Sequence, residues 1–187
     1  RPYSLVNRRH KLWNAQGTGA VFNGLDDHVR NQPNGHYAMA VEESLKCDVY
    51  SYIFNNRCCG QNNGGYLFVR PGETYEFSID MGQRWYDSGI GCGPGGWNLK
   101  DVHLGLIKEE IIASMKNTRR CLSANWFEVV AAVGLEGQQP QRIVPVNGTP
   151  SILQPTTSGE LFLFANDHPK KYGNNAGSIQ VTIKRTA

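Results

Sequence analysis

The chain has 187 residues, of which 40% are hydrophobic, and its formal net charge is +3. This composition predicts a folded domain with a hydrophobic core and excludes an intrinsically disordered chain. The charge is small and the basic residues are scattered, so no nucleic-acid partner is expected. No apolar run reaches the ~20 residues of a membrane-spanning helix.

The cysteine count is odd, which implies at least one free thiol or an intermolecular bridge. The five residues are Cys47, Cys58, Cys59, Cys92 and Cys121. The neighbouring Cys58 and Cys59 are not expected to bridge each other, because a disulfide between adjacent residues is strained. The spacing fits no standard zinc site. We therefore expect buried or loop thiols, and the pairing stays open.

Residues 1–45 differ in pattern from the rest of the chain. Turn-rich pieces alternate there with two stretches that favour helix, at 25–31 and 37–45. Alanine and glutamate in the second stretch support this expectation. We predict that residues 1–45 form an N-terminal extension, or the end of an upstream domain.

From about residue 46 the pattern is typical of short strands separated by turns. Strands are expected at 49–54, 66–69, 74–79, 127–133, 161–164 and 179–184, with a glycine-rich loop at 89–96. One helical stretch is expected at 98–116, because Ile107, Ile111, Ile112 and Met115 share a helical face. The fold class predicted is mainly β: a jelly-roll-like β-sandwich with one inserted helical segment and a short mixed N-terminal extension.

The segment 166–177 carries the chemistry, because it lies between two expected strands and gathers oxygen donors. It holds the carboxylate of Asp167 and the amides of Asn166, Asn174 and Asn175. Calcium binds six to eight such oxygens and tolerates irregular geometry, whereas zinc prefers Cys and His. A plain turn is the alternative interpretation, because Asn and Gly adopt positive φ easily.

The order of residues in this segment resembles a known family. Phe-Ala-Asn-Asp at 164–167, then Tyr-Gly-Asn-Asn-Ala-Gly-Ser at 172–178 and a final alternating strand, are similar to the C-terminal signature of the LecA-like (PA-I type) calcium-dependent galactophilic lectins. Val-Pro-Val-Asn at 144–147 and Pro-Gly-Glu at 71–73 follow the same order. The resemblance covers about residues 46–187.

The resemblance implies a jelly-roll-like sandwich with one calcium ion (Ca²⁺) at its edge. Side-chain oxygens would come from Asp167, Asn174 and Asn175, and backbone carbonyls from Tyr86 and Lys171. Two adjacent sugar hydroxyls would complete about seven ligands. The affinity for sugar would then come from the ion rather than from a deep pocket.

Sugar contacts are also implied by the resemblance, with departures. Asp167 and Asn174 would bond sugar hydroxyls, with the backbone of His168 nearby. The family's His and Gln, which hold the exocyclic hydroxyl, fall on Ser114 and Asn117, and the helical stretch at 98–116 has no counterpart. Galactose preference is therefore left open.

We predict a non-catalytic, calcium-dependent carbohydrate-binding module of the galactose type, with no catalytic residues. One alternative is a targeting or structural module of a larger enzyme or toxin, in which calcium is kept for loop order and sugar binding is lost. A second is a protein-interaction domain that keeps the ion. Trp85 and Trp97 either pack in the core or stack on a sugar. A homo-oligomer is possible, and a secreted or extracellular location is favoured.

Overall fold

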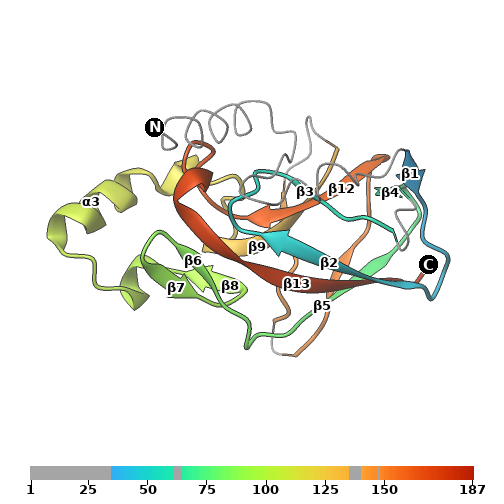
Figure 1. Cartoon of the computed structure of the whole chain (residues 1–187), viewed down its shortest axis with the longest axis horizontal. Coiled ribbons are helices and arrows are strands. Elements are labelled where there is room, and N and C mark those ends of the chain that lie inside the picture. The colour runs from blue at the N-terminus through green and yellow to red at the C-terminus, as the bar shows by residue number, and fades with distance from the viewer. Residues whose placement is uncertain (1–34, 61–64, 135–139, 147) are drawn as a thin grey trace, which may run out of the picture.

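The computed structural model describes residues 35–60, 65–134, 140–146 and 148–187. Two β-sheets pack face to face, and a helix extends from one end of the molecule (Figure 1). The predicted β-sandwich with one inserted helical segment is thus confirmed. No helix in the described ranges combines the length and the apolar character needed to cross a membrane.

The larger sheet contains seven of the described strands, in the order β1-β4-β12-β9-β10, with β3 beside β12 and β8 beside β9. Their bounds are β1 His36–Tyr37, β3 Asn56–Arg57, β4 Tyr66–Val69, β8 Gly95–Trp97, β9 Trp126–Val133, β10 Gln141–Arg142 and β12 Gly159–Ala165. The β1–β4 pair is parallel, whereas β12 runs antiparallel to both β4 and β9.

The smaller sheet contains six described strands in the order β11-β5-β13-β6-β7, with β2 beside β13. Their bounds are β2 Ser44–Tyr50, β5 Tyr75–Ile79, β6 Trp85–Asp87, β7 Ile90–Cys92, β11 Ser151–Leu153 and β13 Asn175–Arg185. The last strand, β13, pairs with β2, β5 and β6 along its length. It is therefore the central strand of this sheet.

The core forms because both sheets alternate in burial and turn their apolar faces inward. In β5, the side chains of Tyr75, Phe77 and Ile79 are buried. Ser78, which lies between Phe77 and Ile79, is exposed. Strand β12 is buried on both faces, and Phe162 and Phe164 point into a second apolar cluster together with Tyr172. Tyr172 of this second cluster belongs to the connection between β12 and β13.

Two local predictions fail. Residues 37–45 form no helix: β1 ends at Tyr37, Glu42 adopts φ 70°, and β2 begins at Ser44 with strictly alternating burial. Tertiary pairing with β13 outweighs the helix propensity of alanine and glutamate there. The glycine-rich stretch 89–96 is also not one loop, because β7 lies wholly within it and β8 begins in it.

The helical stretch predicted at 98–116 is present but broken. It comprises the 3₁₀ turn η2 Leu99–Asp101, the helix α3 Leu106–Ser114 and the 3₁₀ turn η3 Lys116–Thr118. Ile112 and Met115 pack against the core, whereas Ile111 is exposed. The expected apolar face is therefore only partly used. Along the long axis of the molecule, α3 lies toward the same end as β6 and β7 (Figure 1).

Residues 35–45, which the sequence predicts as part of the extension, pair and pack with strands of the sandwich. Strand β1 pairs with β4, and Met39 is buried in the core. The helix expected at 25–31 lies outside the described residues. Cys47 and Cys58 form a disulfide, and Cys59, Cys92 and Cys121 are free thiols.

Candidate functional site

The candidate site lies in the connection between β12 and β13. The 3₁₀ turn η4, Tyr172–Asn174, leads directly into β13 at Asn175. Tyr172 is fully buried, and its hydroxyl donates to the carbonyl of Ala165 at 2.5 Å and accepts from Arg120 Nη1 at 3.1 Å. The Arg120 guanidinium also lies over the rings of Phe54 and Phe164. The buried tyrosine thus fixes where the loop returns to the sheet.

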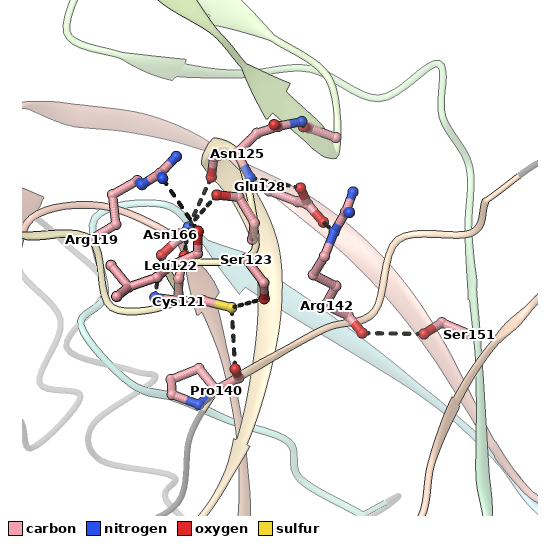
Figure 2. A network of polar contacts seen from close by, with 12 residues as sticks. Arg119, Cys121, Leu122, Ser123, Asn125, Glu128, Pro140, Arg142, Ser151 and Asn166 are labelled. Atoms are coloured by element: carbon pink, nitrogen blue, oxygen red, sulfur yellow. Dashed lines mark hydrogen bonds and ion pairs between the residues drawn. The ribbon is translucent and has the colours of Figure 1, made fainter. Parts of the chain in front are cut away.

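Asn166 begins the loop and has a structural role. Its Oδ1 accepts from the Cys121 amide at 2.8 Å, and its Nδ2 donates to the carbonyls of Cys121 and Asn125, each at 2.8 Å (Figure 2). The same network includes buried Glu128, which binds Arg142 Nε at 2.6 Å. These bonds engage both ends of the Asn166 amide, so the side chain holds the start of the loop to the segment around Cys121.

Asp167 and Asn175 come together at the start of β13. The Asn175 Nδ2 donates to Asp167 Oδ2 at 3.0 Å and to the Ser51 carbonyl at 3.1 Å. The other Asp167 oxygen accepts from the His168 amide at 2.6 Å. Both side chains are buried, at 3% and 9% exposure, and Asn175 Oδ1 has no hydrogen-bond partner among the described residues.

Strand β6 brings a second carboxylate, that of Asp87, next to Asn175. Asp87 is directly opposite Asn175 in the antiparallel register between β6 and β13. Directly opposed residues project from the same face of a sheet, with Cβ atoms roughly 4.5–5.5 Å apart. Gly177 permits this close pairing: it has φ +89°, and a Cβ there would meet Trp85 Cα at 3.1 Å.

Burial and neighbouring charges shift the pKa of both carboxyl groups. Burial, with the nearby Asp167 charge as the second cause, raises the pKa of Asp87 to about 7. Burial also raises the pKa of Asp167, although the bonds from Asn175 and His168 act in the opposite direction. Lys171 lowers the pKa of both groups through its charge. For both carboxyl groups, the described neighbours thus offset only part of the cost of burying a negative charge.

The other predicted ligands lie around this pair. The backbone of Tyr86 pairs with Ala176, next to Asn175, and the Tyr86 side chain is exposed. Lys171 precedes η4, its side chain is exposed, and its carbonyl accepts from the Asn174 amide at 3.2 Å. Asn174 is exposed at the end of η4. The fold thus brings the backbone segments that contain all five predicted ligands close together.

The predicted sugar contacts are less closely grouped. His168 adjoins Asp167, and its Nδ1 accepts from the Lys170 amide at 3.0 Å. Ser114 ends α3, is exposed, and donates to the Ile111 carbonyl of its own helix. Asn117 is exposed in η3. No contact described for Ser114 or Asn117 joins them to Asp167, so their role stays a prediction.

The two tryptophans considered for sugar stacking are buried. Trp85 has 0% exposure and packs edge-on against Phe127, and Trp97 has 5% exposure and stacks on Trp126. Their core-packing interpretation is confirmed. Trp97 has an additional contact, because its Nε1 donates to Asp87 Oδ2 at 3.2 Å.

The residues present fit a calcium ion by the chemistry of their donors. Within the described ranges, no three or more His, Cys, Asp or Glu side chains gather as a metal site. Calcium does not require such a cluster, because amide and backbone carbonyl oxygens serve as ligands beside carboxylates. The unpartnered, buried Asn175 Oδ1 is the observation that favours a cation here.

Asp87 is absent from the residues predicted on sequence. The resemblance points to the carbonyl of Tyr86, and the next residue carries a carboxylate. A carboxylate adjoining an expected ligand is a signal that sequence reasoning could have used. Its proximity to Asn175 depends on the pairing of β6 with β13, which residue order alone does not give.

Comparisons with known proteins give a distant structural likeness. No protein-family model and no curated protein matches this chain. Among solved structures, the chain is similar to one described as "EclA N-terminal domain; PllA-like lectin". The two share 17% sequence identity and a TM-score of 0.42, over 75% of this chain and 95% of the other. At this distance the likeness carries no argument about function, and membership of the LecA type stays a prediction.

Proposed function

We propose that this chain is a calcium-dependent, galactose-type carbohydrate-binding module without catalytic activity. The observation that carries the proposal is the buried Asn175 Oδ1, which lacks a hydrogen-bond partner among the described residues while its amide nitrogen is held by Asp167. Leaving a buried acceptor unsatisfied costs about 1–3 kcal/mol. A bound cation would offset that cost.

The chain's own residues would hold the ion as the resemblance implies. Asp167, Asn174 and Asn175 would supply side-chain oxygens, and Tyr86 and Lys171 would supply carbonyls. Calcium, when bound, offers coordination positions to two adjacent hydroxyls of a sugar. The exposed Asn174 then lies where its side chain can reach a ligand from solvent.

The test is a calcium titration followed by thermal unfolding and glycan binding. Calcium should raise the melting temperature of the wild-type chain, and chelator should reverse the rise and abolish binding on a glycan array. Asp167→Asn should lose most of the calcium-dependent rise, because it replaces a buried carboxylate with a neutral amide. The exposed Asp101→Asn is the matched control and should behave as wild type.

Each alternative corresponds to a distinct result. Calcium stabilisation with no binding to any glycan would favour an ion kept for loop order, as in a structural, targeting or protein-interaction module. The proposal would be contradicted if neither calcium nor chelator changed the melting temperature or the glycan binding. The galactose preference is tested by competition between galactose and other simple sugars on the same array.

A further inference from the structure

The register between β6 and β13 places Asp87 where a second carboxylate could reach the proposed ion. Asp87 and Asn175 are directly opposed, and Asn175 binds Asp167 through its amide nitrogen. The three side chains thus come from β6, from the connection that follows β12 and from the start of β13. Asp167 and Asn175 are close in the sequence, whereas Asp87 reaches Asn175 only through the pairing of β6 with β13.

The orientation of the Asn175 amide is fixed by its neighbours. Its Nδ2 faces two acceptors, the Ser51 carbonyl at 3.1 Å and Asp167 Oδ2 at 3.0 Å. A flipped amide would place Oδ1 against those two acceptors, where oxygen would meet oxygen and both bonds would be lost. Oδ1 is therefore held on the opposite side, buried and without a donor among the described residues.

The Asp87 carboxylate is also oriented from one side. Trp97 Nε1 donates to its Oδ2 at 3.2 Å, and no donor to its Oδ1 occurs among the described residues. Trp97 is itself held by stacking on Trp126, with ring centroids 6.0 Å apart. A buried tryptophan that orients an acidic ligand from behind is the arrangement expected around a metal site.

The formal charges of the side chains favour a divalent cation over a further neutral donor. Asp87 is opposite Asn175 in the strand register, and Asp167 accepts from the amide nitrogen of Asn175. Two carboxylates match the charge of one calcium ion. A neutral donor would satisfy Asn175 Oδ1 but would bring no positive charge to the two carboxylates.

We propose that Asp87 is a direct carboxylate ligand of the calcium site, in addition to Asp167, so that the ion is held by two acidic groups from different strands. This inference rests on the proposed function, because it concerns the same ion. It predicts that calcium binds in the absence of any sugar, since the protein supplies the full balancing charge. It also makes Asp87 a determinant of metal affinity that the lectin resemblance does not imply.

Isothermal calorimetry with calcium chloride on the whole chain, in chelator-treated buffer without sugar, tests the inference. Asp87→Asn keeps the shape of the side chain but removes its charge, and should weaken calcium affinity by at least about tenfold, or about 1.4 kcal/mol. Asp101→Asn makes the same charge change at an exposed position and should stay within about twofold of wild type.

Folding is checked separately, in chelator. Because the side-chain oxygen that Asp87→Asn retains can still accept from Trp97 Nε1, the melting temperature of this variant without calcium should stay close to that of wild type, while its gain on adding calcium should shrink. Asp87→Ser provides a second, smaller side chain with the same expected loss of affinity.

The possible failures are distinguishable. Wild-type affinity in both Asp87 variants, with affinity lost in Asp167→Asn, would overturn the role of Asp87 and leave the proposed function intact. Absence of calcium binding by the wild-type chain would overturn both. A loss of affinity equal to that of Asp101→Asn would show a general charge effect and would also count against Asp87 as a ligand.

Discussion

Two asparagines of the C-terminal segment use the same functional group differently. Asn166 satisfies both ends of its amide with backbone groups around Cys121 and Asn125, so it works as a structural clamp. Asn175 uses only its nitrogen within the described structure and keeps its oxygen unpartnered. The difference lies in what surrounds each amide, since the residue types are identical.

Substitutions at Asn166 and at the exposed Asn174 should therefore separate stability from metal binding. Asn166→Ala leaves a buried amide and buried carbonyls without partners, and should lower the free energy of unfolding by about 3 kcal/mol or more, with or without calcium. Asn174→Ala should change stability by less than about 0.5 kcal/mol in chelator, yet weaken calcium binding. Chemical denaturation and calorimetry give the two quantities; equal effects of both variants on stability would contradict this assignment.

At the scale of elements, strand β13 connects the site to the rest of the smaller sheet. Its first residues face β6, and its last residues face β5, where Arg185 pairs with Tyr75 in the register. Tyr75 is fully buried, and its hydroxyl donates to Glu73 Oε2 at 2.7 Å. Arg185 Nη1 binds the other oxygen of Glu73 at 3.2 Å. A polar cluster thus fixes the end of β13 remote from the site.

Tyr75 should make stability fall at alkaline pH. Burial, followed by the bond to Glu73 and its charge, raises the pKa of Tyr75 above its ordinary value of 10.0. The folded state then keeps the phenol proton at a pH where the unfolded chain loses it, so the free energy of unfolding decreases as pH rises above about 10. Tyr75→Phe should reduce this slope, measured by urea denaturation between pH 8 and pH 11. Other tyrosines with raised pKa, such as Tyr52, leave a residual slope; identical profiles would contradict the prediction.

At the scale of the whole molecule, a covalent link joins the two sheets. Cys47 lies in β2 of the smaller sheet, and Cys58 directly follows β3 of the larger one. Both sulfurs are buried in the core that the sheets share. Disulfides persist mainly in oxidising environments, and the secreted or extracellular location stays a prediction.

Removing this link should destabilise the sandwich measurably. A disulfide that spans 11 residues contributes about 3 kcal/mol by restricting the unfolded chain. The double variant Cys47→Ser and Cys58→Ser should therefore unfold at a lower temperature, and reductant should change wild type but not the variant. Cys59→Ser is the control, because that thiol is free and only half-buried. Equal melting temperatures for wild type and the double variant would contradict the prediction.

The sequence by itself determined the fold class and the segment that holds the candidate site. A short apolar run predicted the strand at 66–69, alternation of apolar and polar residues predicted the strand at 74–79, and oxygen donors between two apolar runs marked the loop at 166–177. Such signals are local, because the period of a strand and the preferences of a turn are properties of neighbouring residues. The calcium and sugar roles of these residues remain predictions.

Only the tertiary structure decided which donors share a place. The pairing of β6 with β13 brings Asp87 opposite Asn175. The Asn166 side chain instead hydrogen-bonds the backbone around Cys121. A second long-range pairing, of β2 with β13, outweighed the helix propensity of residues 37–45. Strand register is set by packing across the whole core, so residues distant in the sequence become neighbours for reasons that no short segment contains.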